Sequence, residues 1–241
     1  MMVLCGWSTR TMLDRSNITS AGLGNFRGRP HRRRSALMQF FFVRHGESEA
    51  NLLKVFSNRG WKHPLTANGR QQVEQLAENL KRRRVVAIYT SPLRRAVESA
   101  ELLGARLQVN YQIEPALIEY DVGIYEGQSV AEGGQALDAV ERRWREADCS
   151  ARLPGGESCE DIRMRFVPFI GRIIGQFRAH DHAAVVLIGH DGTYRQALPA
   201  VLCNVSPAFA ADHGLANTAC VEAVLRGNAL HCIRWSEDVP G

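Results

Sequence analysis

The sequence predicts an α/β fold, a three-layer α/β/α sandwich around a mostly parallel central sheet, and three observations lead to it. Two runs, FFFV before Arg44 and AAVVLIG before His190, are apolar throughout, as strands are when both faces of a sheet are covered. Segments with helical periodicity separate these and the other strand-like runs. Strands that alternate with helices favour one parallel sheet with helices on both faces. Neither an internal repeat nor an interdomain linker interrupts the pattern.

Six strands are expected from Met38 onward. They occupy residues 39–45, 85–91, 107–111, 183–190, 220–226 and 230–235. The third is short and is expected at an edge of the sheet. Gly227-Asn228 joins the last two, and this dipeptide favours a tight hairpin.

Five helices are expected between the strands. They occupy residues 65–83, 91–103, 136–147, 158–178 and 193–202. Thr66 can cap the first helix, and Ser91-Pro92 offers the second a cap followed by proline at the first helical position. The stretch 128–153 around the third helix is polar and least regular, and we interpret it as a lid that selects the substrate.

The positive charge of the chain is concentrated in residues 1–37. The formal net charge is +5, whereas residues 1–37 alone hold seven arginines and one acid, so the rest of the chain is close to neutral. We therefore expect residues 1–37 to be a basic, disordered extension and residues 38–241 to be the functional domain. Met38 is an alternative start, because MQFFFVRHG opens directly into the first strand. A near-neutral domain argues against a nucleic-acid binder or an adaptor that uses the basic segment.

The cysteine and hydropathy patterns argue against a zinc protein, a disulfide-rich protein and a membrane-spanning protein. The six cysteines are scattered without a CxxC pair, which gives neither a usual zinc spacing nor a disulfide framework. No apolar run approaches the roughly 20 residues that span a bilayer. We expect a cytoplasmic protein that binds no metal, cofactor, nucleic acid or membrane; a homodimer remains open.

Histidines and arginines are expected to meet at one edge of the sheet. Two strands end at His45 and His190, and a third leads into SPLRRA, which brings Arg94 or Arg95 to a helix start. Carboxyl ends of parallel strands lie on the same edge, where α/β proteins bind ligands. Arginine forks and a helix N-terminus bind phosphoryl oxygens well. Together these residues predict a site for a phosphoryl group.

Six blocks of sequence carry a resemblance to a known family. In chain order they are RHGESEAN, PLTANGRQQ, SPLRRAVESA, LIEYDVGIYEG, PGGES and GHDGTYR. They resemble the histidine phosphatase superfamily, in the branch that contains phosphoglycerate mutases and fructose-2,6-bisphosphatases. The resemblance implies a phosphoglycerate mutase-like fold and a small phosphorylated substrate.

The same resemblance assigns the site residues. His45 would attack phosphorus and become phosphohistidine, while His190 would support the in-line transition state. Arg44, Arg95 and Asn51 would bind phosphoryl oxygens; Arg95 is preferred to Arg94 because the family's arginine directly precedes an alanine. The chemistry agrees, since a histidine nucleophile splits hydrolysis into two easier displacements and fixed cations stabilise the charge. It requires an acceptor for the second ring N–H of His45, which the sequence does not identify.

Two carboxylic acids compete for the role of general acid. Glu119 matches the family's acid, and a bound phosphate beside it should raise its pKa. Asp191 follows His190 directly, as the acid does in the acid phosphatase and phytase branch, and it is also expected near the phosphate. Glu157 and Ser158 in PGGES are expected to cap the following helix, with a place in the phosphate pocket as the alternative.

The expected function is a metal-independent phosphomonoesterase that forms a phosphohistidine. The alternative is a phosphoglycerate mutase that uses the same phosphohistidine. The true mutases of this family carry an arginine-rich insertion that ends in a proline run. Residues 128–158 contain Arg142, Arg143 and Arg145 but no proline run, which favours the phosphatase. The sequence does not name the phosphorylated substrate.

Overall fold

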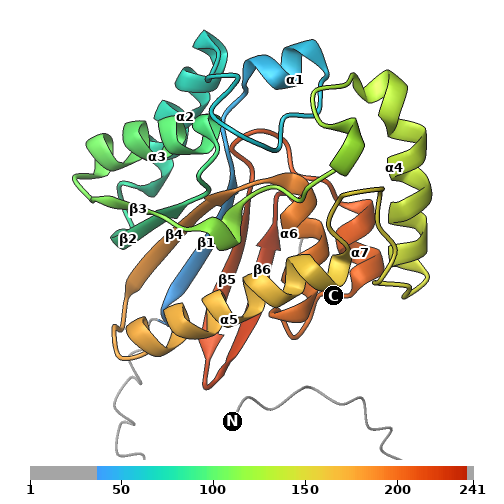
Figure 1. Ribbon diagram of the computed structural model, residues 1–241. Coiled ribbons are helices and arrows are strands. Elements are labelled where there is room, and N and C mark those ends of the chain that lie inside the picture. The colour runs from blue at the N-terminus through green and yellow to red at the C-terminus, as the bar shows by residue number, and fades with distance from the viewer. Residues whose placement is uncertain (1–36, 238–241) are drawn as a thin grey trace, which may run out of the picture. The chain divides into compact units, whose positions relative to one another are not determined.

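The computed structural model describes residues 37–237 (Figure 1). The expected basic extension over residues 1–37 lies outside this range apart from Leu37. The question of whether Met38 is the natural start is not addressed by these residues.

A six-stranded sheet forms the centre of the described region. Its strands are β1 (Gln39–Arg44), β2 (Arg84–Thr90), β3 (Tyr111–Ile113), β4 (Ala183–Gly189), β5 (Cys220–Arg226) and β6 (Ala229–Trp235). Their order is β3-β2-β4-β1-β5-β6. The pairs β3–β2, β2–β4 and β4–β1 are parallel, and β5 runs antiparallel to both of its neighbours. The predicted α/β class with a mostly parallel sheet is confirmed.

Seven α-helices and three short 3-10 turns surround the sheet in residues 37–237. The helices are α1 (Glu49–Leu53), α2 (Ala67–Leu80), α3 (Arg94–Leu107), α4 (Val130–Arg145), α5 (Cys159–Phe177), α6 (Asp191–Ala197) and α7 (Pro207–Asp212). The 3-10 turns are η1 (Pro115–Leu117), η2 (Gly123–Tyr125) and η3 (Leu198–Ala200).

Alternate residues of β1 separate the two helical layers. Phe40 and Phe42 belong to the core shared with α5 and α6, while Phe41 and Val43 belong to the core shared with α2 and α3. This is the period-two alternation of a strand that is covered on both faces. Phe40 and Phe42 are fully buried, and burial of such a ring contributes roughly 1.5–3 kcal/mol. The apolar sequence of β1 therefore follows from its central place in the sheet (Figure 1).

Several predicted boundaries are wrong, each for a local reason. Helix α3 begins at Arg94 with Leu93 as its N-cap, so Ser91-Pro92 precedes the helix and does not start it. The predicted edge strand 107–111 shares only Tyr111 with β3, because α3 continues to Leu107 and ends on Gln108 in the left-handed region (φ 58°). The third helix begins earlier than predicted, at Val130, where Ser129 forms a capping box. The short helices α1 and α7 were missed.

The carboxyl edge of the sheet is covered by α1 and α4 (Figure 1). Val130 N, at the start of α4, donates to Lys54 O at the end of α1 over 2.7 Å, and Val55 pairs with Ser129 in a β-bridge. These contacts hold the polar segment 128–145 beside the end of β1. The segment interpreted as a lid thus lies next to the strand end that carries His45.

Candidate active site

The two motif histidines meet at the ends of neighbouring strands. β1 and β4 pair in register from Gln39 to Arg44, so His45 and His190 follow them at the same edge. Their ring centroids lie 5.0 Å apart, and the two residues are only 3% and 1% exposed. The predicted convergence of the two motifs is therefore present in the structure.

The hydrogen bonds of His45 assign its tautomer. Nδ1 lies 2.7 Å from Gly46 O, an acceptor only, so the ring proton is on Nδ1. Nε2 is then unprotonated and accepts from Arg95 Nε over 3.0 Å. Burial, followed by the charges of Arg95 and Arg44, lowers the pKa of His45 well below its ordinary value, although the bond to Gly46 opposes the shift. A neutral imidazole with an unprotonated Nε2 has the form that a nucleophile requires, once Arg95 gives up this hydrogen bond.

Gly46 is required by a close approach of two backbones. A Cβ built on this residue would lie 2.6 Å from Gly69 O in α2. No side chain fits there without moving that helix. The glycine that follows the histidine thus lets the loop pass α2 while its own carbonyl orients the imidazole.

Two arginines flank the histidines. Arg95 lies in the first turn of α3. Its Nη1 donates to Ser57 O over 2.6 Å, and its Nη2 lies 3.3 Å from His190 Nδ1. Burial is the main cause that lowers its pKa to about 10, so the guanidinium stays charged near neutral pH. Arg94 turns away and pairs with Glu98 at 2.8 Å, which agrees with the preference for Arg95.

Arg44 is held at one end only. Its terminal nitrogen donates to Leu215 O over 2.5 Å, while its buried Nε has no hydrogen-bond partner among the described residues. A buried cationic donor without a partner is costly in a protein, and an anion in the pocket would satisfy it. This geometry is the one expected of a residue that binds a phosphoryl oxygen.

His190 is oriented by Ser91. Because Arg95 donates toward Nδ1, the proton of His190 is on Nε2, which lies 2.8 Å from Ser91 Oγ. Burial first, and then the charge of Arg95, lowers the pKa of His190 well below its ordinary value. Ser91 is predicted as the cap of a helix that starts at Pro92, but α3 starts two residues later, and the hydroxyl contacts His190 besides accepting from Leu93 N over 3.3 Å.

Asn51 and Asn217 connect α1 to the backbone of His45, and the sequence did not predict Asn217. Asn51 Oδ1 accepts from Ser48 N and from Ser48 Oγ, both at 3.0 Å, which leaves its Nδ2 group for the pocket that Asn51 lines. Asn217 Nδ2 donates to His45 O at 3.1 Å and to Asn51 Oδ1 at 3.3 Å. Asn217 lies 172 residues from His45 in the chain and outside the six sequence blocks, so no motif marks it.

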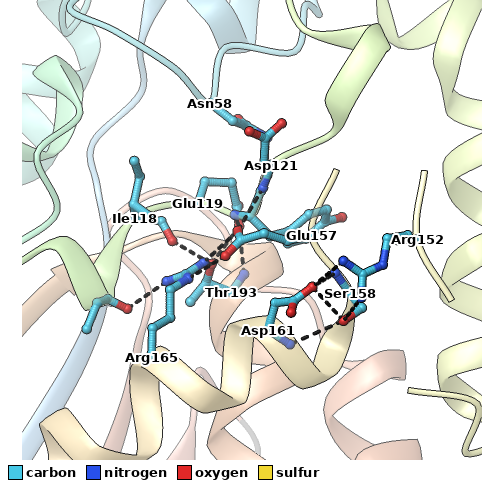
Figure 2. Close-up of polar contacts among 12 residues, drawn as sticks. Asn58, Ile118, Glu119, Asp121, Arg152, Glu157, Ser158, Asp161, Arg165 and Thr193 are labelled. Carbon is cyan, nitrogen blue, oxygen red and sulfur yellow. Dashed lines mark hydrogen bonds and ion pairs between the residues drawn. The ribbon is translucent and has the colours of Figure 1, made fainter. Parts of the chain in front are cut away.

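Glu119 is hydrogen-bonded to Thr193 at the start of α6 (Figure 2). Its Oε1 accepts from Thr193 N (2.7 Å), Thr193 Oγ1 (3.0 Å) and Tyr120 N (3.0 Å), and its Oε2 accepts from Gly192 N (3.1 Å). Burial chiefly, and then the charge of Asp191, raises the pKa of this carboxyl, against the effect of its hydrogen bonds. A Cβ on Gly192 would lie 3.0 Å from Glu119 Oε1, so the glycine permits this approach.

Asp191, the rival acid, is engaged elsewhere. Its Oδ1 accepts from Leu215 N over 2.7 Å, and its Oδ2 lies 3.3 Å from Arg195 Nε at an ion-pair distance. These contacts tie the start of α6 to the loop that also receives Arg44. Asp191 lines the pocket, and its role toward a phosphate remains a prediction.

A half-buried ion pair connects α5 to the loop that carries Glu119. Arg165 contacts both oxygens of Glu157, and it donates to Ala116 O over 2.7 Å. Glu157 Oε2 accepts in turn from Asp121 N over 3.0 Å, as Figure 2 shows. Ser158 caps α5 through Asp161 N as expected. Glu157 acts on the loop that carries Glu119, a role that the sequence did not indicate.

A pocket of about 340 Å³ joins these groups. His45, Arg44, Arg95, Asn51, Glu119 and Asp191 line one end of it, and residues of α4 line the other. In residues 37–237, no group of three or more His, Cys, Asp or Glu side chains is arranged to hold a metal ion. The first end thus combines two arginines and the neutral imidazole of His45 with two carboxylic acids.

Within the same residues, no helix is both long enough and apolar enough to cross a membrane. The expected localisation in the cytoplasm stays a prediction.

A family comparison decides the identity of the domain. The model of the histidine phosphatase superfamily (branch 1) matches residues 40–238. The chain belongs to this superfamily. The resemblance seen in the six sequence blocks is thereby confirmed.

Curated relatives cover parts of the chain. A bifunctional protein of Mycobacterium tuberculosis is 32% identical over 71% of this chain, which spans 44% of that protein's length. Phosphoserine phosphatase 1 of Hydrogenobacter thermophilus is 29% identical over 69% of this chain and 77% of its own. A Proteus mirabilis protein named as a probable phosphoglycerate mutase is 28% identical over 64% of this chain and 70% of its own.

Solved structures share the fold. A mycobacterial glucosyl-3-phosphoglycerate phosphatase superposes with a TM-score of 0.70 at 23% identity. The match covers 83% of this chain and 99% of that one. Among its relatives this member of the histidine phosphatase superfamily has proteins named as phosphatases and as mutases, so the reaction has to be argued from the site.

Proposed function

We propose that the protein is a phosphomonoesterase that hydrolyses small phosphorylated metabolites through a phosphohistidine on His45. The observation that carries the proposal is the tautomer of His45, whose proton is held by Gly46 O while Nε2 is directed at the arginine-lined pocket. A phosphoryl group bound there takes the place of His45 as the partner of Arg95. Arg44 and Arg95 then balance the charge on the equatorial oxygens.

The first half-reaction transfers the phosphoryl group. The Nε2 lone pair of His45 attacks phosphorus, the bond to the ester oxygen breaks, and the alcohol leaves with a proton from Glu119. The raised pKa of Glu119 supports this role, because an acid must hold its proton until the leaving group needs it. The bonds from Thr193 N and Gly192 N hold the carboxyl at the start of α6, and Glu119 lines the same pocket as His45, which supports this role.

The second half-reaction releases phosphate. Glu119, now a carboxylate, accepts a proton from water, whose oxygen attacks phosphorus as the bond to His45 Nε2 breaks. His190 lies beside His45 and accepts from Arg95 through Nδ1, so it supports both steps by orienting the guanidinium that binds the phosphoryl oxygens. Inorganic phosphate leaves, and His45 regains its free Nε2.

The arginines of α4 argue against the mutase alternative. A mutase has to retain the phosphorylated intermediate while it reorients, and for this it needs cations over the pocket. Arg143 pairs with Asp148 at 2.5 Å, Arg145 lies 3.5 Å from Asp212, and neither of them nor Arg142 lines the pocket. This arrangement favours transfer to water.

The test is to trap the intermediate. Rapid acid-free quenching during turnover of a ³²P-labelled phosphate ester should give protein label that is stable to alkali, lost in acid and assigned to His45. His45→Ala should abolish the label and the hydrolysis, while the matched variant His180→Ala, at an exposed residue, should retain both. Hydrolysis that survives His45→Ala would overturn the proposal. Transfer of the label to 2- or 3-phosphoglycerate in preference to water would favour the mutase.

A further inference from the structure

The pocket has a second end that the phosphoryl chemistry does not use. We call it the leaving-group end and define it by Tyr120, Val130, Leu137, Asp138, Glu141 and Arg195, all of which line the pocket. Val55, Phe56 and Val122 add apolar wall beside it. Four of its residues come from α4, the segment interpreted as a lid. An alcohol released from the phosphoryl group would occupy this space.

The single arginine at this end is already neutralised. Arg195 donates to Glu141 Oε1 over 3.0 Å and to Oε2 over 3.3 Å, and its Nε lies 3.3 Å from Asp191. Tyr120 Oη also donates to Glu141 Oε1, over 2.9 Å. The Arg195 and Glu141 side chains are only 16% and 14% exposed, so this pair is poorly screened by water. The buried Nε of Arg195 has no hydrogen-bond partner among the described residues, but the guanidinium lies between Glu141 and Asp191, so these two carboxylates already balance its positive charge.

The other charges around the pocket are unfavourable for a second acid. The described residues that line it include three arginines and four carboxylic acids. Arg44 and Arg95 belong to the phosphoryl end, whereas Asp138, exposed on α4, has no ion-pair or hydrogen-bond partner in the described structure and borders the leaving-group end. A carboxylate or second phosphate on the alcohol would lie among Asp138, Glu141 and the phosphoryl group itself. Like charges repel one another more strongly in a partly desolvated pocket than in open water.

From this charge pattern we infer that the enzyme selects phosphate monoesters whose alcohol is neutral or positively charged, and that Asp138 and Glu141 on α4 determine this specificity. The inference rests on the proposed phosphatase function and adds the class of substrate. It separates this chain from relatives whose names denote phosphoserine or phosphoglycerate compounds, because both of those alcohols carry a carboxylate. The apolar wall accommodates the carbon skeleton of the alcohol, and the acids exclude an acidic substituent.

The experiment compares esters that differ by one carboxylate. Glycerol 3-phosphate is paired with 3-phosphoglycerate, and phosphoethanolamine with phosphoserine, with p-nitrophenyl phosphate as a general phosphatase substrate. The expected result is a kcat/KM at least about tenfold higher for the partner without the carboxylate in each pair, as repulsion by one like charge in such a site implies. Equal values, or a preference for the acidic partner, would overturn the inference while p-nitrophenyl phosphate hydrolysis left the phosphatase proposal intact. Failure to hydrolyse any ester would overturn both.

Variants of α4 test the assigned residues. Asp138→Lys should lower the ratio of kcat/KM between glycerol 3-phosphate and 3-phosphoglycerate at least about fivefold, because it places a cation at the leaving-group end. Glu146→Lys makes the same charge change at the exposed C-cap of α4, outside the pocket, and should leave the ratio unchanged. Glu141→Gln keeps an acceptor for Tyr120 but frees Arg195 from one carboxylate, so it should also shift the ratio toward the acid. An unchanged ratio in both pocket variants, or an equal shift in Glu146→Lys, would contradict the role of these residues.

Discussion

Glu119 and Thr193 are joined twice, because Glu119 Oε1 accepts from both the backbone N (2.7 Å) and the hydroxyl (3.0 Å) of Thr193. This pairing fixes the carboxyl against the helix that starts directly after His190. A carboxyl so placed, with a raised pKa, can deliver a proton to a leaving alcohol beside the nucleophile. The relationship makes the identity of the acid testable.

Glu119→Gln should cause a loss that depends on the leaving group. The amide keeps the size of the side chain but has no proton to give, so kcat on glycerol 3-phosphate should fall roughly 10²–10⁴-fold. Hydrolysis of p-nitrophenyl phosphate should be largely spared, because p-nitrophenolate leaves as a stable anion. Steady-state kinetics on both esters measure the difference. An equal loss on the two esters would remove Glu119 from the role of acid.

Asp191→Asn should behave differently. Asp191 supports Leu215 N and Arg195, so its replacement disturbs the pocket and not a proton transfer. Both esters should therefore lose activity together, or neither should. If Asp191→Asn gives the selective loss and Glu119→Gln does not, the assignment of the acid is reversed.

Arg165 should act as a positioning residue for Glu119. It holds Glu157 and Ala116 O, which border the loop that carries Glu119. Arg165→Met should lower kcat on glycerol 3-phosphate about tenfold or more, since a loosened acid is misaligned, while p-nitrophenyl phosphate is affected much less. Arg178→Met, at the far end of the same helix, is the control. Equal losses on the two esters would indicate a general loss of folding, and thermal unfolding of each variant separates that case.

A chain that begins at Met38 should fold and retain its activity. All six motif blocks lie between residues 44 and 195, and the family match begins at residue 40. Expression of residues 38–241 should give soluble protein with an unchanged kcat/KM on p-nitrophenyl phosphate. A several-fold loss of soluble protein or activity would show that residues 1–37 contribute to the domain.

The sequence predicted the parts of the fold that depend on local pattern. The apolar runs of β1 and β4 identified two buried central strands, and their parallel pairing follows from the helices between them. The predicted ends of helices were wrong where a tertiary contact overrides a local sequence signal. Ser91 has a cap-like sequence context, yet its hydroxyl contacts His190, 99 residues away, and α3 starts later.

For the site, too, the sequence indicated the residues that belong to local motifs but not their partners from elsewhere in the chain. Residues within motifs, such as His45 and Arg95, could be named because their spacing is local. The partners that set their chemistry are backbone carbonyls or distant side chains: Gly46 O, Ser57 O and Asn217 have no pattern of their own. Glu157 was expected to cap α5 because the sequence before a helix suggests it, whereas its partner Arg165 only becomes apparent in three dimensions.

Stability should fall in mild acid because of the two site histidines. The pKa values of His45 and His190 in the folded protein are well below the ordinary 6.5, chiefly because both rings are buried. As the pH falls below about 6.5, the unfolded chain therefore binds protons that the folded chain does not. The free energy of unfolding should decrease through this range and continue to decrease until the folded pKa values are reached.

Urea unfolding between pH 7.5 and 5 measures this dependence. Each histidine adds at most about 1.4 kcal/mol per pH unit to the slope, since one pKa unit corresponds to that energy. His190→Asn removes one of the two groups while retaining a polar side chain, so it should reduce the slope even if its stability at pH 7.5 is lower. Bound inorganic phosphate would add its own linkage, so phosphate-free buffer is needed. A slope that is the same in His190→Asn as in the unaltered chain would show that other groups govern acid unfolding.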